Sequence, residues 1–348
     1  SGGMFVQSIK FIQAHHGNTK NVSIYGQEYT NTTYKLAKMN LAIRGISGNL
    51  GEKAADTFGD DQHKDLKADY IMANPPFNQK DWRAENELKD DPRWRGYEVP
   101  PKSNANYGWI LNMVSKLSEN GVAGFILANG ALSGGGEEYK IRRKLIENNL
   151  VEAILVLPRN LFYTTDISVT LWILNKNKKE QSRNIGDVTR HYRNREKEIL
   201  FMDLRQIGEP FEKKYTQFSI EDIRKIASTY HQWQSASFVR AALVAAPELD
   251  EGIGQPQGIA PTIAPMITPA YKNIPEYCYS ASFDEVAKKD FSLVPSKYIE
   301  FVNRDENIDF DEKMQNLQTE FVELLKAENQ SKNDLLNVFK ELGYEIKL

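Results

Sequence analysis

The sequence has 348 residues, of which 41% are hydrophobic and 26% are charged, and this composition excludes a disordered or fibrous chain. It contains no apolar run long enough to cross a membrane, and its net charge of −3 argues against a protein that holds nucleic-acid phosphates without a partner. Its one cysteine, Cys278, excludes an intramolecular disulfide and suits a reducing cytoplasm, and the five histidines show no metal-ligand spacing, so we expect no metal site.

Small residues open the sequence and lead directly into a helical pattern. Ser1, Gly2 and Gly3 leave the backbone uncovered, so a ligand such as a cofactor could approach it closely. So short a glycine pair is also what a cloning remnant looks like, and both interpretations stay open.

Residues 21–28 have the pattern of a strand that ends in an acid, Glu28. A helix through residue 43 follows, and Thr30 or Asn31 is its expected N-cap. An acid at the end of such a strand is typical of sites that bind ribose hydroxyls in doubly wound folds. The alternative is a solvated glutamate in a loop.

Residues 68–73 are apolar and strand-like, and Asn74-Pro75-Pro76-Phe77 ends this run abruptly. Proline has no backbone N–H and forces the residue before it into an extended conformation, so the chain must leave the sheet rigidly at this point. In open α/β sheets, ligands bind at the carboxyl ends of the strands.

The same four residues carry groups that suit chemistry on an amino group of a base. The Asn74 side-chain oxygen and the Pro75 carbonyl could hold the two hydrogens of an exocyclic amino group and localise its lone pair toward an electrophile. Phe77 could stack on the ring, as aromatic side chains do with an extruded base. The alternative is an ordinary turn between a strand and a loop.

Residues 78–106 form a long polar stretch without a regular pattern, which is typical of a functional or mobile loop. Arg93 and Arg95 alternate there with Trp82 and Trp94, and such interleaving favours phosphate contacts and base stacking. Acidic residues offset the basic charge, so a solvated loop without a function is the alternative.

From residue 107 onward, apolar strands alternate with helices, which predicts a mostly parallel sheet. The expected elements are helices over residues 107–120 (with Gly121 as the C′ residue), 137–148 and 220–233, and strands over residues 122–128, 151–157, 167–174 and, as the last strand, 199–204. Residues 176–198 are charged and predict a surface hairpin loop.

Residues 247–275 are rich in Pro, Gly and Ile without periodicity, which is typical of an irregular linker. The tail is helical, with an apolar stripe through Leu317, Phe321 and Leu324 that is interrupted at residues 331–334 and resumes at Leu335. Such a stripe packs either on its own domain or on the helices of a partner.

Asn74-Pro75-Pro76-Phe77 resembles the catalytic motif of the N6-adenine DNA methyltransferases that use S-adenosylmethionine. Together with Asp56-Thr57-Phe58 and residues 67–78, it makes the sequence similar to the modification (methyltransferase) subunit of type I restriction–modification systems. The likeness runs from residue 1 to about residue 300.

The resemblance implies an S-adenosylmethionine-dependent methyltransferase fold, an α/β doubly wound, Rossmann-like sheet with a helical C-terminal extension. It also implies three parts of the chain: a catalytic domain over residues 1–245, a linker and closing segment over residues 246–300, and a helical arm for subunit contacts over residues 301–348.

The resemblance further implies a role for most of the candidate residues. It assigns catalysis to Asn74, Pro75, Pro76 and Phe77, the back half of the first cofactor motif to Ser1, Gly2 and Gly3, and ribose binding to Glu28, which matches the family's Gly-x-Glu position. The Asp-Pro strand end that precedes this cofactor motif in the family is absent, so we expect an N-terminally truncated form.

For two further positions the sequence leaves two possible roles open. At Asp56 the family has a polar or acidic residue that approaches the cofactor adenine, and a helix or turn cap is the alternative. The loop before the strand at residues 167–174 can supply a second aromatic to the flipped base, through Phe162 or Tyr163, and an aromatic that only packs under the loop is the alternative.

The implied reaction is direct transfer of the sulfonium methyl to N6 of adenine in double-stranded DNA. A separate specificity subunit would read the target sequence, and a second modification subunit and a restriction (nuclease) subunit are further expected partners. Two alternatives stay open: RNA or a protein glutamine as the methyl acceptor, and a scaffold without catalysis.

Overall fold

The computed structural model describes residues 1–15, 17–84, 86–163, 165–185, 188–212, 214–235, 270–302 and 310–341. The chain forms two compact units, residues 1–300 and residues 301–348. Most of the predicted linker over residues 247–275 lies outside the described residues. Within the described ranges, no helix is long and apolar enough to span a membrane.

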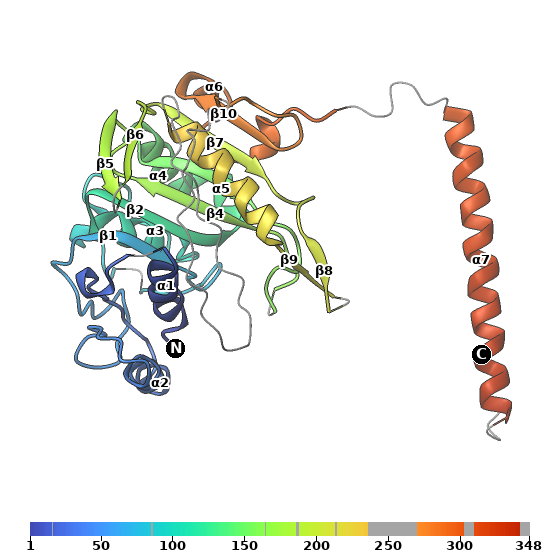
Figure 1. The fold of residues 1–348 in the computed structure, drawn as a ribbon, viewed down its shortest axis with the longest axis horizontal. Helices are drawn as coiled ribbons and strands as arrows, with labels where there is room; N and C mark the ends of the chain where they lie inside the picture. Colours follow the sequence, from blue (N-terminus) through green and yellow to red (C-terminus); the bar gives the residue numbers. More distant parts are fainter. Residues whose placement is uncertain are drawn as a thin grey trace, which may run out of the picture. The chain divides into compact units, whose positions relative to one another are not determined.

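A six-stranded sheet forms the centre of the first unit (Figure 1). Its strands, in spatial order, are β1 (Ala68–Ala73), β2 (Leu117–Ala128), β4 (Val169–Asn175), β3 (Val151–Val156), β7 (Glu198–Asp203) and β10 (Cys278–Ser282). β1 is parallel to β2 and β3 is parallel to β7, whereas β4 is antiparallel to both neighbours and β10 is antiparallel to β7. Four strands therefore share one direction, which confirms the predicted, mostly parallel α/β sheet.

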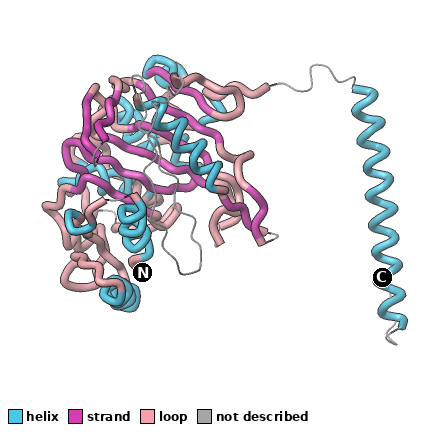
Figure 2. The backbone as a smooth tube through the Cα atoms, in the orientation of Figure 1, coloured by secondary structure: helices cyan, strands magenta, loops and turns pink. Residues whose placement is uncertain are grey.

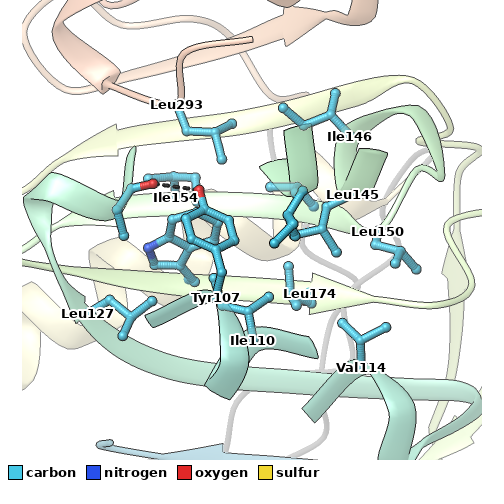
Figure 3. Packing of buried hydrophobic residues seen from close by; sticks show 14 of the residues in the cluster. Tyr107, Ile110, Val114, Leu127, Leu145, Ile146, Leu150, Ile154, Leu174 and Leu293 are labelled. Carbon is cyan, nitrogen blue, oxygen red and sulfur yellow. Dashed lines mark hydrogen bonds between the residues drawn. The ribbon is translucent and has the colours of Figure 1, made fainter. Parts of the chain in front are cut away.

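Helices lie on both faces of this sheet (Figure 2), because successive strand residues point to opposite faces. The helices on the first face are α3 (Asn106–Lys116) and α4 (Gly136–Glu147), and α5 (Ile220–Gln234) lies on the second. Figure 3 shows the first face, where Tyr107 of α3 lies among apolar side chains that include Ile154 of β3. On the second face, Trp233 of α5 belongs to the same cluster as Leu155 of β3.

The remaining elements are short. They are η1 (Thr19–Asn21), η2 (Pro92–Trp94), η3 (Asn129–Leu132), η4 (Pro295–Lys297), α6 (Phe283–Lys288) and two hairpins, β5 (Gln181–Ile185) with β6 (Val188–Tyr192) and β8 (Glu209–Phe211) with β9 (Tyr215–Gln217). The first hairpin confirms the prediction for residues 176–198. No sequence pattern predicts the second.

A smaller cluster lies at the end of the unit where β1 forms the edge of the sheet (Figure 1). It joins the helices α1 (Gly3–Ala14) and α2 (Asn31–Ile43). Val6 of α1 and Ala37 of α2 are both buried in it. Thr30 accepts the Thr33 N–H at 3.3 Å and so caps α2, as predicted.

The predicted strand over residues 21–28 is wrong. Among the described residues, only Tyr25 of this segment makes a β-bridge, to Asn49 on a parallel segment. Two hydrogen bonds hold the bridge: Gly26 N–H donates to the Asn49 carbonyl at 2.9 Å, and Asn49 N–H donates to the Ile24 carbonyl at 2.8 Å. Without a longer partner segment, a ladder cannot extend beyond this pair.

The predicted C′ role of Gly121 is also wrong, because α3 ends at Lys116 and β2 begins at the next residue. The pairing of β1 with β2 jumps from Ala68–Leu117 to Tyr70–Val122, so the residues between form a bulge. A Cβ on Gly121 would lie 2.8 Å from the Ala68 carbonyl oxygen. Glycine is needed here for the close approach of two backbones, not for ending a helix.

Residues 199–204 are not the last strand, because β10 pairs all five of its residues with β7. β10 has the sequence Cys-Tyr-Ser-Ala-Ser, which lacks a β-branched run and alternates weakly. The pairing comes from the available edge of β7, which a sequence pattern does not show.

The second unit contains α7 (Phe310–Glu341), a helix of 32 residues. The helix continues through the polar residues 331–334, which interrupt the apolar stripe as expected. This segment is polar but contains neither Gly nor Pro, and nothing in its backbone chemistry stops a helix. The apolar side chains of Leu317, Phe321 and Leu324 are exposed.

Candidate active site

The Asn74–Phe77 loop leaves the carboxyl end of β1 at the edge of the sheet. Pro75 is buried and Asn74 is exposed, and no described residue hydrogen-bonds the Asn74 amide. Phe77 is half-buried and packs against the cluster of the second face, where Phe162 also packs. The loop therefore presents an open amide oxygen next to a ring that its neighbours hold in place.

The two tryptophans of residues 79–105 are packed rather than solvated, because Phe58 lies among their rings. The Phe58 ring centroid lies 4.4 Å from Trp82 and 6.4 Å from Trp94, and both tryptophans are buried. A buried ring has no face left for a base. The prediction that these two tryptophans stack on nucleic acid is wrong.

Arg93 also contacts residues 57–58, beside the packed aromatic rings. Its guanidinium donates to the Thr57 and Phe58 carbonyls, each at 2.7 Å, and to the two carboxylate oxygens of Asp91 at 2.8 and 2.7 Å. Burial acts to raise the pKa of the Asp91 carboxyl, but the hydrogen bonds and charge of Arg93 outweigh burial and lower it. Arg93 therefore ties this loop to residues 57–58 and is not available for a phosphate, whereas Arg95 is exposed.

The structure brings Ser1, Gly2 and Gly3 next to Glu28. The Ser1 nitrogen contacts the Glu28 carboxylate, whose side chain is 27% exposed, and Asn40 Nδ2 donates to the Ser1 carbonyl at 2.9 Å. Gly2 has a left-handed φ of +73°, and a Cβ on Gly3 would have no atom within 4 Å. An open backbone thus lies beside a carboxylate that can accept from two hydroxyls, which fits a nucleoside cofactor.

Gln27, which no sequence pattern singles out, joins the segment of Glu28 to the loop of Asp56. Its Nε2 donates to the Ala55 carbonyl at 3.0 Å and to the Asp60 carbonyl at 2.9 Å. The Glu28 carbonyl accepts the Ala55 N–H at 3.0 Å. The two acids predicted to bind the cofactor therefore lie on hydrogen-bonded segments.

Asp56 caps its own turn. Its Oδ1 accepts the Phe58 N–H and its Oδ2 accepts the Gly59 N–H, each at 3.2 Å. These contacts match the turn-cap alternative. Each carboxylate oxygen keeps a further lone pair, so a contact with the cofactor adenine stays a prediction.

The two candidate aromatics of the loop before β4 differ. Phe162 packs against the cluster of the second face, which matches the packing alternative, whereas Tyr163 is exposed. The Tyr163 ring meets Tyr215 of β9 edge to face, with centroids 4.7 Å apart at 72°. Sequence analysis missed Tyr215, because only the β8–β9 hairpin brings it to this loop.

Two further observations within the described ranges concern metal and thiol groups. No group of His, Cys, Asp and Glu side chains there is arranged to hold a metal ion. Cys278 is buried within β10, and burial raises the pKa of its thiol, which disfavours the thiolate.

The sequence model of the family N-6 DNA Methylase matches residues 1–307. The chain belongs to this family. The methylase subunit of type I restriction enzyme HindI from Haemophilus influenzae is 39% identical over 347 residues, which cover 99% of this chain and 67% of that relative. The MjaIX methylase subunit from Methanocaldococcus jannaschii is 32% identical over 348 residues, covering 99% of this chain and 54% of the relative. The chain thus spans between about half and two thirds of these relatives.

Solved structures share the fold of this member of the N-6 DNA Methylase family. The type I restriction-modification methyltransferase subunit from Streptococcus thermophilus has a TM-score of 0.60 and 24% identity, covering 79% of this chain and 48% of that one. The EcoKI M protein has a TM-score of 0.52 and 18% identity, covering 90% of this chain and 60% of that one. The predicted methyltransferase fold and the resemblance to type I modification subunits are both confirmed.

Proposed function

We propose that this N-6 DNA methylase transfers a methyl group from S-adenosylmethionine to N6 of adenine in double-stranded DNA, as the modification subunit of a type I restriction–modification complex. The observation that carries the proposal is the Asn74–Phe77 loop, with its exposed amide, buried Pro75 and half-buried ring at the carboxyl end of β1.

The chain's own residues act on the acceptor amine. The Asn74 oxygen and the Pro75 carbonyl accept the two hydrogens of the adenine amino group, which localises its lone pair. They also stabilise the positive charge that develops on nitrogen, since a cationic amine is a stronger hydrogen-bond donor. Phe77 stacks on the extruded base.

The proposed cofactor residues lie on the segments joined by Gln27. S-adenosylmethionine supplies an electrophilic methyl group when bound. Glu28 binds its ribose hydroxyls, Asp56 approaches its adenine, and the open backbone of residues 1–3 lies beside Glu28. Holding the two reactants in line is the main contribution of such a site.

The test replaces Asn74 by alanine in the whole protein, assembled with its specificity subunit. We expect single-turnover methylation of adenine-containing duplex DNA to fall by about 10²–10³-fold, with cofactor affinity nearly unchanged, because this oxygen acts mainly in the transition state. Asn74→Asp keeps an acceptor oxygen and should lose less. Near-normal turnover of Asn74→Ala would remove this loop from catalysis and favour the scaffold alternative.

Phe77→Ala tests the base-binding role. We expect capture of the flipped base to weaken by about 1–3 kcal/mol, the usual contribution of one base–aromatic stack. Binding to duplexes that carry an abasic site at the target position measures this, because the loss should disappear there. Equal losses on both duplexes would contradict the stacking role, and transfer to RNA or to glutamine peptides instead of DNA would favour the other acceptors.

The proposed partners are the specificity subunit, a second modification subunit and a restriction subunit, in the cytoplasm. The exposed apolar row of α7 is the proposed contact for the helices of another subunit, because Leu317, Phe321 and Leu324 recur at heptad spacing along one helix face.

A further inference from the structure

Directly after Phe77, the chain turns through a left-handed asparagine. Asn78 has a φ of +51°, a conformation that Asn tolerates better than most residues. Its backbone N–H donates to Asn106 Oδ1 at 3.0 Å, and Asn106 Nδ2 donates back to Asn78 Oδ1 at 2.9 Å. The two amides thus form a reciprocal pair 28 residues apart.

A third amide completes the arrangement. Asn104 Nδ2 donates to Asn78 Oδ1 at 3.3 Å, and Asn104 Oδ1 accepts the Asn106 N–H at 2.9 Å. Asn106 is the first residue of α3 and is 1% exposed, so its amide cannot exchange these partners for water. We call Asn78, Asn104 and Asn106 the amide clamp.

The clamp closes the base of the loop that follows the candidate active site. Next to it, Ala105 N–H donates to the Gln79 carbonyl at 2.9 Å, and Asp81 N–H donates to the Lys102 carbonyl at 3.0 Å. The Asn74–Phe77 loop is therefore anchored at both ends, by β1 before it and by the start of α3 after it.

We propose that Asn78 and Asn106 are positioning residues for methyl transfer: the clamp fixes the backbone that carries Asn74 and Phe77 and so holds the acceptor amine in line with the methyl donor. This rests on the proposed function. A misplacement of about 1 Å in such a reaction can cost on the order of 10²-fold in rate. In this proposal the clamp acts through the loop and not by binding either reactant.

Substitutions at Asn78 and Asn106 remove different hydrogen bonds of the amide clamp, so their effects can be compared. Asn78→Gly keeps the left-handed turn and the backbone N–H but removes the acceptor of the Asn106 and Asn104 amides. Asn78→Asp keeps that acceptor. Asn106→Asp keeps an acceptor for the Asn78 N–H but places a carboxylate against Asn78 Oδ1, which loses one bond and adds repulsion.

A matched control lies elsewhere in the chain. Asn149 is also left-handed, with a φ of +60°, and its Oδ1 accepts the Lys197 N–H at 2.8 Å. It precedes β3 and lies in neither the candidate active site nor the loop. Asn149→Gly therefore makes the same chemical change at a site that should not affect transfer.

The experiment uses the whole protein with its specificity subunit. We expect Asn78→Gly to slow single-turnover methylation about 10–100-fold, with cofactor affinity nearly unchanged and only a small loss of melting temperature. Asn106→Asp should slow it at least as much and should also lower the melting temperature, because it leaves a carboxylate in a buried site. Asn78→Asp should recover most of the rate, and Asn149→Gly should match the unchanged protein. A rate within twofold of normal for Asn78→Gly would overturn the proposal, as would parallel losses of rate, cofactor affinity and melting temperature.

A second measurement separates the clamp from the proposed function. Amide hydrogen exchange across residues 74–81 should accelerate at least tenfold in Asn78→Gly but not in Asn149→Gly, whatever the protein methylates. Unchanged exchange would overturn the clamp itself. Faster exchange in a protein that leaves adenine unmethylated would instead count against the proposed reaction and, with it, the positioning role.

Discussion

Residues 79–105 and the helix α7 show opposite relations between regular structure and burial. Among its described residues the loop contains only the short η2 as regular structure, yet Trp82 is 7% exposed and Trp94 is 2% exposed. The 32 residues of α7 are regular throughout, yet Leu317 is 51% exposed and Phe321 is 61% exposed. Backbone regularity follows from local propensity, whereas burial requires partners, and only the loop has them within its own unit.

The loop lacks a ladder of backbone hydrogen bonds, so side chains satisfy its polar backbone groups. Trp82 Nε1 donates to the Pro101 carbonyl at 2.9 Å, and Trp94 Nε1 donates to the Leu88 carbonyl at 2.7 Å. Each tryptophan therefore buries its apolar ring and also donates a hydrogen bond to a backbone carbonyl that would otherwise be buried without a partner.

The largest expected effect comes from the loop. We expect Trp94→Ala to lower the free energy of unfolding of the unit over residues 1–300 by about 3–5 kcal/mol, because it leaves a cavity beside Phe58. Phe321→Ala in α7 is the matched control and should change it by less than about 0.5 kcal/mol. Chemical denaturation, followed by the tryptophan fluorescence of the unit, measures both. Similar losses of unfolding free energy in the two variants would contradict the difference in burial between residues 79–105 and α7.

A smaller effect on the free energy of unfolding, from the Asp91–Arg93 pair, should depend on pH. Because Arg93 lowers the pKa of Asp91 in the folded state, this pair stabilises the fold fully above the unfolded pKa of about 4 and loses that contribution as pH falls through the folded pKa. We expect Asp91→Asn to be less stable than the unchanged protein by about 1–2 kcal/mol at pH 7, with a gap that narrows below pH 4. Urea unfolding at several pH values checks this, and a gap that widens on acidification would show the sign to be wrong.

The smallest effect on stability should come from α7, together with a large effect on assembly. We expect Leu317→Glu combined with Leu324→Glu to change the unfolding free energy of residues 1–300 by less than about 0.5 kcal/mol while releasing the partner subunit in size-exclusion chromatography. Unfolding of the unit in place of release would mean that this row is part of its core.

The sequence alone determined the features that depend on near neighbours. Two prolines remove backbone donors, so the strand before Asn74 had to end there, and a side-chain oxygen at Thr30 was enough to cap α2. The period of apolar residues likewise predicted the helices α3, α4 and α5 and the strands β2, β3, β4 and β7, but not β8, β9 or β10, because that period reflects which faces are buried. The recognition of the Asn74–Phe77 loop as a candidate site rests on the same local chemistry.

Only the tertiary structure decided what depends on partners far along the chain. Arg93 and Trp94 look available for nucleic acid in the sequence, but the loop carries them onto residues 57–58, which bury them. Asn78 and Asn106 are two unremarked polar residues until the fold sets their amides 2.9 Å apart. The chemistry of a side chain can be read from the sequence, but its role depends on which group the fold places within hydrogen-bonding distance. No local sequence pattern encodes that neighbour.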